Sequence, residues 1–226
     1  MSSDDPAAPQ PSIRDKLRAL HALAGPYRRD DADDAPADPT ALFLRWLDAA
    51  IATGQPEPHA MTLSTVDEDG RPDARVLLLK DVDADGWHFA STKQGVKGRH
   101  IAANPNAALT FYWQPLGRQV RIRGTAKDLG AEASRDDFLA RSPSARAIAL
   151  AGRQSNVLAS AQAVDAEFSR QQARLVAEPE LIAPGWTAYV LAAQEVEFWQ
   201  GNEDRRHWRL KYSREGTHWS RTLLWP

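Results

Sequence analysis

From residue 61 onward, the chain consists of short apolar segments separated by turn-forming residues. Residues 61–66 alternate between apolar and polar side chains and are closed by Asp67-Glu68-Asp69-Gly70, which is typical of a β-hairpin. Residues 75–80 form a nearly continuous apolar run with a charge at each end, which predicts a buried strand. Further strands are expected at residues 87–91, 107–113, 118–126, 186–192, 196–200, 208–212 and 219–224. Short strands joined by tight turns indicate an antiparallel barrel rather than a parallel α/β sheet.

Helical spacing of apolar residues occurs before the strands and again in the middle of the chain. Residues 13–23 carry an apolar stripe that Gly25-Pro26 ends, and Asp38-Pro39 starts a second helix that Gly54 ends. Other helices are expected at residues 96–103, 130–140 and 156–177. The pattern predicts a flexible N-terminal segment with a short helix over residues 1–37, including a charged linker at 28–34. A single domain is expected over residues 38–226.

Composition narrows the class of protein. Of the 226 residues, 42% are hydrophobic and the formal net charge is −2, so no overall basic field predicts nucleic-acid binding. The sequence has no cysteine, which excludes disulfides, thiol catalysis and cysteine-bound metals. The six histidines are scattered, so we expect no metal site. No run of about 18 apolar residues predicts a membrane span, and the acidic N-terminus is unlike a signal peptide. We therefore expect a cytoplasmic protein.

The most chemically distinctive stretch lies near the C-terminus. A strand beginning at Val196 reaches a turn at Gly201-Asn202, and three arginines and one histidine follow within residues 205–209. In an extended segment, Arg205, His207 and Arg209 would point the same way. Two fixed cations and a titratable ring beside an aromatic side chain suit a flat, anionic ligand. The alternative is a solvent-exposed basic strand with a tryptophan in the core.

This stretch reads E-F-W-Q-G-x-E-x-R-x-H-x-R from Glu197 to Arg209. It resembles the pyridoxine/pyridoxamine 5′-phosphate oxidase family, and the resemblance extends over nearly the whole chain from about residue 39. Arg75 to Lys80 matches the family motif R-x-x-L-L-K. The resemblance implies a mainly β protein with flanking helices (α+β), an antiparallel split β-barrel that binds FMN. It also implies a homodimer with FMN at the interface between the subunits.

The resemblance carries site residues over by motif. The implied FMN contacts are Arg75, Val76, Leu77, Leu78, Lys80, Ser91, Lys97, Gln119, Gln154, Ser155, Trp199 and Arg209. Lys80 and Arg141 would bind a substrate phosphate. Arg205 and His207 would bind the substrate ring and act as the catalytic residues.

Four positions depart from the family pattern. Ala90 stands in place of an aromatic residue and Val96 in place of an arginine at the FMN phosphate. Asp137 and Ala145 stand at the positions of a tyrosine and a serine that contact the substrate phosphate. Because an aspartate repels a dianionic phosphate unless it turns away or pairs with an arginine, the departures bear on both cofactor affinity and substrate.

The resemblance implies oxidation of pyridoxine or pyridoxamine 5′-phosphate to pyridoxal 5′-phosphate, with molecular oxygen as acceptor and release of peroxide. Two alternatives remain. Phe89-Ala90-Ser91, Lys97-Gly98-Arg99 and Leu210-Lys211-Tyr212 resemble a neighbouring branch, the phenazine-biosynthesis flavin oxidases, whose substrates carry no phosphate. A flavin-binding protein without turnover is the other alternative, since Ala90 and Val96 weaken the cofactor site.

Overall fold

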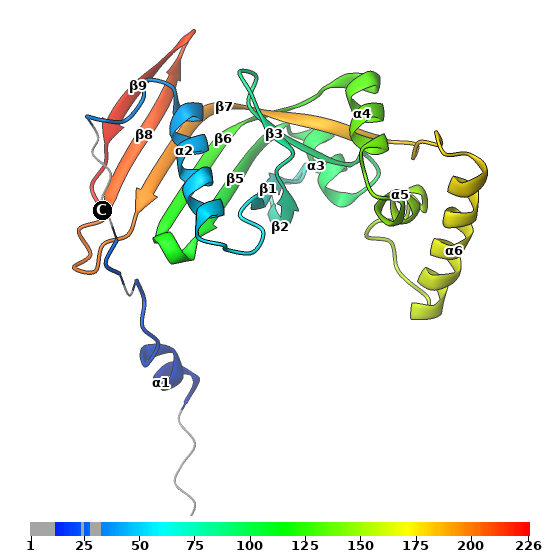
Figure 1. Cartoon of the computed structure of the whole chain (residues 1–226), viewed down its shortest axis with the longest axis horizontal. Coiled ribbons are helices and arrows are strands. Elements are labelled where there is room, and N and C mark those ends of the chain that lie inside the picture. Colours follow the sequence, from blue (N-terminus) through cyan, green and yellow to red (C-terminus); the bar gives the residue numbers. More distant parts are fainter. Residues whose placement is uncertain (1–11, 24, 28–32) are drawn as a thin grey trace, which may run out of the picture.

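The computed structural model describes residues 12–23, 25–27 and 33–226, and is dominated by a single antiparallel sheet (Figure 1). Nine strands form it, in the order β2-β1-β5-β6-β7-β4-β3, with β8 paired to both β7 and β9. The strands are β1 (Ala60–Val66), β2 (Pro72–Leu78), β3 (Asp81–Val82), β4 (Trp87–Thr92), β5 (Asn106–Trp113), β6 (Arg118–Asp128), β7 (Trp186–Gln200), β8 (Trp208–Glu215) and β9 (His218–Leu223).

Strand β7 holds the two ends of the sheet together. Its first part pairs with β4 and its last part pairs with β8, while β6 runs along both. The β6–β7 register shifts between Arg123 and Gly124, where the backbones approach so closely that a side chain on Gly124 would strike the carbonyl of Ala192. The shift is a bulge that bends the long ribbon, and glycine is required there.

The helix α2 (Pro39–Ala52) covers one face of the sheet and closes the main core (Figure 1). Asp38 caps it by accepting a hydrogen bond of 2.9 Å from the amide of Thr40. On the buried side of α2, Phe43 packs edge-on against Phe111, and Trp46 packs edge-on against Phe198. The apolar stripe predicted from the sequence therefore lies against the inner residues of the strands.

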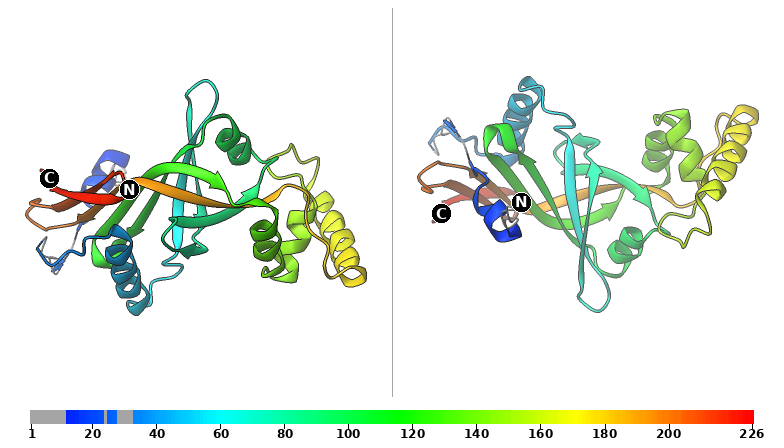
Figure 2. Two further views of the ribbon diagram at one scale, coloured as in Figure 1. Left: turned by 90° about the horizontal axis from the view of Figure 1, so that it is seen from above. Right: turned by 90° about the horizontal axis from the view of Figure 1, so that it is seen from below.

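Four helices lie away from α2. They are α3 (Val96–Ala103), α4 (Gly130–Leu139), α5 (Pro143–Leu150) and α6 (Ala161–Ala177). A second, smaller apolar cluster joins α4, α5 and α6 around Phe138, Ala147 and Leu175. Both views of Figure 2 place α5 and α6 at one end of the molecule and β8 and β9 at the other. Beyond these, the chain contains the short helix α1 (Ile13–Arg18) and a turn of 3₁₀ helix (Gln114–Leu116).

The strands and helices confirm most of the sequence predictions, with four corrections. The apolar run at residues 75–80 is not a buried strand: residues 75–78 lie in the edge strand β2, where Val76 is 66% and Leu78 41% exposed in the single chain, and the buried Leu79 follows the end of the strand. Residues 186–200 form one strand rather than two. The first predicted helix ends at Arg18, and the last begins at Ala161 instead of residue 156.

Some predictions lie outside what the structure tests. Most of the charged linker at residues 28–34, and Ala24 of the predicted N-terminal stripe, lie outside the described residues. Within the described part, no helix has the length and apolar character needed to cross a bilayer. The division at residue 37 and the cytoplasmic location stay predictions.

Candidate active site

A cavity of about 580 Å³ opens between the strands β2 and β4 and the helices α5 and α6. Eight of the predicted site residues line it: Val76, Leu77, Leu78, Lys80, Ser91, Lys97, Arg141 and Gln154. They come from five separate parts of the sequence, so the fold gathers them. Arg75 lies next to this group, and its charge acts on Lys97.

Lys97 places a buried positive charge at one end of the cavity. Its side chain is 7% exposed and its Nζ donates a hydrogen bond of 2.8 Å to Oε1 of Gln154. Burial lowers the pKa of Lys97, and the nearby charge of Arg75 lowers it further. Since the amide of Gln154 carries no charge, an anion would stabilise this ammonium.

The surroundings of Lys97 supply further donors for an anion. The Oγ of Ser91 is buried and has no hydrogen-bond partner in the described part of the chain. Gly95 caps α3 without a side-chain hydrogen bond, which leaves the first amides of the helix to a ligand. A side chain on Gly98 would strike the carbonyl oxygen of Thr92, so only glycine permits this close turn. This donor set fits a phosphate group.

Arg75 is held in place beside this anion site. Its Nη1 donates 2.8 Å to Oγ1 of Thr65 and 3.2 Å to the carbonyl of Leu63, and its Nη2 pairs with Asp73. The guanidinium therefore reaches across β1 from the edge strand in a fixed orientation.

A second charged group, built around Lys80 and Arg141, also lines the cavity. The Nζ of Lys80 lies 3.4 Å from Oδ1 of Asp137, and Nε1 of Trp186 donates 2.8 Å to Oδ2 of the same carboxylate. The guanidinium of Arg141 stacks over the Trp186 ring at 4.1 Å and donates 3.1 Å to the carbonyl of Ala145. Burial lowers the pKa of Arg141, and the charge of Asp137 opposes this shift.

Sequence reasoning missed two features of this cavity, Trp186 and an apolar wall. Trp186 lies in a predicted strand, where an aromatic residue signals packing as readily as binding. The apolar wall is formed by Ile148, Leu158 and Val164. Ile148 and Val164 lie in the amphipathic helices α5 and α6, and Leu158 lies in the loop between them, so their sequence carries no sign of a ligand site.

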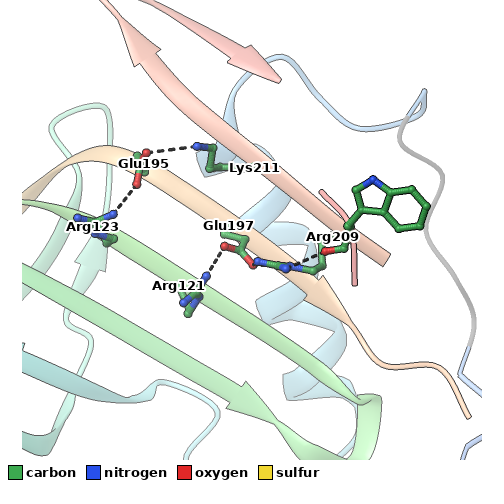
Figure 3. Close-up of polar contacts among 7 residues, drawn as sticks. Arg121, Arg123, Glu195, Glu197, Arg209 and Lys211 are labelled. Atoms are coloured by element: carbon green, nitrogen blue, oxygen red, sulfur yellow. Dashed lines mark hydrogen bonds and ion pairs between the residues drawn. The ribbon is translucent and has the colours of Figure 1, made fainter. Parts of the chain in front are cut away.

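The remaining predicted site residues lie outside this cavity as the described residues define it. Gln119, Trp199 and Arg209 are direct neighbours across β6, β7 and β8 at the other end of the sheet. They share its outer surface with the ion pairs drawn in Figure 3: Arg121 and Arg209 both pair with Glu197, and Arg123 and Lys211 with Glu195. Arg209 Nη1 also donates 2.8 Å to the carbonyl of Trp225.

The loop between β7 and β8 corrects one prediction. Arg205 has a positive φ of 68° and lies in a turn, so Arg205, His207 and Arg209 do not project together from an extended segment. His207 instead packs against Trp199, with ring centroids 4.9 Å apart, and its Nδ1 accepts a hydrogen bond of 3.1 Å from the amide of Asn202. Burial, followed by the charge of Arg205, lowers the pKa of His207. The ring is thereby favoured in its neutral form, with Nε2 carrying the proton.

Two tryptophans of β7 show how far the cavity lies along the strand from the group formed by Gln119, Trp199 and Arg209. Trp186 lines the cavity, and Trp199 follows thirteen residues later in the same strand, which at 3.2–3.4 Å per residue corresponds to roughly 40 Å along the strand. Ser155, adjacent to Gln154, lies in a turn with a φ of 67°. A single chain therefore presents the predicted site as two separate parts.

Comparison with known proteins identifies the family. A family model described as pyridoxamine 5′-phosphate oxidase matches residues 47–175, more than half of the chain. The chain belongs to the pyridoxamine 5′-phosphate oxidase family. A second model, the pyridoxine 5′-phosphate oxidase C-terminal dimerisation region, matches residues 186–226. Members of the family are FMN-dependent oxidoreductases, as the resemblance of the sequence motifs predicts.

Individual relatives agree with the family model. The pyridoxine/pyridoxamine 5′-phosphate oxidase of Ectopseudomonas mendocina is 42% identical over 88% of this chain and 95% of its own length. That of Rubrobacter xylanophilus is 41% identical over 92% of this chain and 97% of its own length.

Solved structures of the pyridoxamine 5′-phosphate oxidase family share the fold. PhzG from Burkholderia lata 383, in complex with tetrahydrophenazine-1-carboxylic acid, is 33% identical, with a TM-score of 0.83 over 89% of this chain and 100% of that one. A pyridoxamine 5′-phosphate oxidase-related, FMN binding protein from Nostoc punctiforme PCC 73102 has a TM-score of 0.67 at 18% identity, over 85% of this chain and 98% of that one. The predicted split barrel is confirmed.

Proposed function

We propose that this protein is an FMN-dependent oxidase that converts pyridoxine or pyridoxamine 5′-phosphate to pyridoxal 5′-phosphate. The observation that carries the proposal is a cavity lined by two cationic groups, Lys97 with Arg75 beside it and Lys80 with Arg141. A phosphorylated flavin and a phosphorylated substrate would each need such a group. The names of the relatives support the same substrate.

In this proposal, Ser91, Lys97 and Arg75 bind the phosphate of FMN, and Gln154 holds the ammonium of Lys97 in position. FMN, when bound, supplies the acceptor for the two electrons of the oxidation. The flavin-binding residues thus act by placing the cofactor, and the free backbone amides at the start of α3 add to the phosphate site.

The separation of the two parts of the site supports a homodimer. Gln119, Trp199 and Arg209 lie too far along the sheet to reach a ligand held by Lys97 in the same chain. In a two-fold dimer, the same residues of a second copy would complete each site. The exposed apolar side chains of Val76 and Leu78 on the edge strand would be covered by the second copy.

The substrate would lie with its phosphate toward Lys80 and Arg141. Arg205 and His207 of the second copy would hold its ring, and the neutral imidazole would donate from Nε2 to a ring hydroxyl. The oxidation removes two electrons and two protons from the hydroxymethyl or aminomethyl group, one hydrogen from its carbon and one from its oxygen or nitrogen, and molecular oxygen takes them up and leaves as hydrogen peroxide. The amine also consumes water and releases ammonia.

Anaerobic mixing of the FMN-loaded protein with pyridoxine 5′-phosphate tests this proposal. We expect the visible flavin absorbance to bleach, to return on admission of air, and pyridoxal 5′-phosphate to form in proportion. A flavin that stays oxidised with pyridoxine 5′-phosphate and with pyridoxamine 5′-phosphate would contradict the assignment. If it stayed oxidised with every alcohol and amine offered, the protein would be a flavin-binding protein without turnover.

A second candidate is the oxidation of a heterocycle without a phosphate. Two observations favour it: the carboxylate of Asp137 lies against Lys80, and Ala145 offers no hydroxyl. The Burkholderia lata relative is a PhzG bound to a tricyclic carboxylic acid. Bleaching by an unphosphorylated aromatic substrate, with none by pyridoxine 5′-phosphate, would support this candidate.

A further inference from the structure

Asp137 adds a negative charge to the cationic group where the substrate phosphate is proposed to bind. It projects from α4, with its side chain 16% exposed, and lies directly behind Lys80 and Trp186, which line the cavity. The hydrogen bond from Trp186 fixes one oxygen of the carboxylate and leaves the other 3.4 Å from the ammonium of Lys80. The carboxylate of Asp137 is therefore oriented toward Lys80, the residue proposed to bind the substrate phosphate.

The charges of this group limit what it can bind. Lys80 and Arg141 carry two positive charges, and Asp137 removes one, so the group as a whole carries one. Arg141 also has partners of its own, the Trp186 ring and the carbonyl of Ala145. A doubly charged phosphate placed against Lys80 would face a carboxylate a few ångströms away, while a single carboxylate or a neutral group would leave less charge uncompensated.

We infer that Asp137 is a specificity-determining residue that lowers the preference of the cavity for a dianionic phosphate ester. Substrates that end in one negative charge, or in none, are then accepted alongside phosphorylated ones. The apolar wall of Ile148, Leu158 and Val164 suits the aromatic or aliphatic body of such substrates. This inference rests on the proposed function, because it names the substrate class of the same site.

The test compares Asp137→Asn with wild type. Asparagine keeps the shape of the side chain and an oxygen for Trp186 but removes the charge. Two ratios are measured on the FMN-loaded protein: kcat/KM for pyridoxine 5′-phosphate over pyridoxine, and the dissociation constant of pyridoxal over that of pyridoxal 5′-phosphate. We expect the substitution to raise both ratios about tenfold or more in favour of the phosphorylated compound.

Asp136→Asn is the matched control. Asp136 is the preceding residue of α4 and is exposed, so the control makes the same change in net charge away from the cavity. Its ratios should stay within twofold of wild type.

The outcomes separate the inference from the proposed function. Ratios that Asp137→Asn leaves unchanged, or changes no more than Asp136→Asn does, overturn the inference even when pyridoxine 5′-phosphate is oxidised. A shifted binding ratio without flavin reduction by either substrate supports the inference and contradicts the proposed function. Failure of both pyridoxal compounds to bind either protein overturns both.

Discussion

Lys97 is the residue whose surroundings most directly predict a site for the cofactor phosphate. Its ammonium is buried, with its pKa lowered by desolvation, and in the described part of the chain it donates a hydrogen bond to the uncharged amide of Gln154. The substitution Lys97→Met removes the charge and shortens the side chain by one atom. A hydrogen bond to a charged group contributes about 1.5–3 kcal/mol, so we expect FMN to bind about 10- to 150-fold more weakly.

Quenching of flavin fluorescence measures this affinity directly. Lys127→Met is the control, because Lys127 is an exposed lysine of β6. It should leave the dissociation constant within about twofold of wild type. An effect of Lys97→Met that did not exceed the effect of the control would show that FMN does not bind at this end of the cavity.

His207 leads to a prediction about pH. Its pKa lies below the ordinary value because of burial and the charge of Arg205, so the unfolded chain binds a proton at a pH where the folded chain does not. The free energy of unfolding should therefore fall as the pH drops from about 6.5, the ordinary histidine value, toward the lowered pKa. Protonation also breaks the hydrogen bond from Asn202 to Nδ1.

Thermal unfolding of wild type and His207→Gln between pH 8 and pH 5 measures this dependence of stability on pH. The wild type should lose more stability, and parallel curves would contradict the prediction.

At the scale of elements, the strands β6, β7 and β8 are joined by two ion-pair rows of different depth (Figure 3). The side chain of Glu197 is 11% exposed and pairs with Arg121 and Arg209, whereas the side chain of Glu195 is 34% exposed and pairs with Arg123 and Lys211. Glu197→Gln would leave two guanidinium groups without their counter-charge. Because one of them is half exposed, we expect a loss of about 1–2 kcal/mol rather than the full value for a buried pair.

The loss of stability in Glu197→Gln appears as a fall in the melting temperature, of roughly 2–4 °C per kcal/mol for a chain of this size. Glu195→Gln is the comparison, since it lies two residues away on the same surface of β7, and its more exposed pairs should contribute less than about 1 kcal/mol. A larger loss for Glu195→Gln than for Glu197→Gln would reverse the expected order.

Elements with local signals were predictable from the sequence, and those set by neighbours were not. The alternation at residues 61–66 gives β1, and Asp38-Pro39 gives the start of α2. The apolar run at residues 75–80 was wrongly predicted to be a buried strand, because composition does not reveal whether the covering partner lies within the same chain. The turn at Arg205 was missed because its positive φ occurs at a residue type that rarely adopts one.

At the scale of the whole molecule, motifs named candidate site residues, but they did not reveal how the fold divides these residues. Lys97, Gln154 and Lys80 meet in one cavity, whereas Trp199 and Arg209 lie at the far end of β7. Spacing along a sequence carries no information on such a separation when strands bend and cross. The length of β7 and the order of the strands were needed to see it.

This division makes a prediction that only an assembly of two chains can satisfy. Lys97→Met impairs one part of the site and Arg209→Met the other, so dimers of either variant should bind FMN poorly at both sites. A dimer containing one chain of each variant has one site with both substitutions and one site with neither.

Co-expression with two different affinity tags, followed by purification on both, isolates this mixed dimer. We expect it to bind about half the FMN of the wild-type dimer at wild-type affinity, measured by flavin absorbance after gel filtration. If both parts of the site came from one chain, each chain of the mixed dimer would retain its own defect, and FMN binding would stay as weak as in the two parent variants.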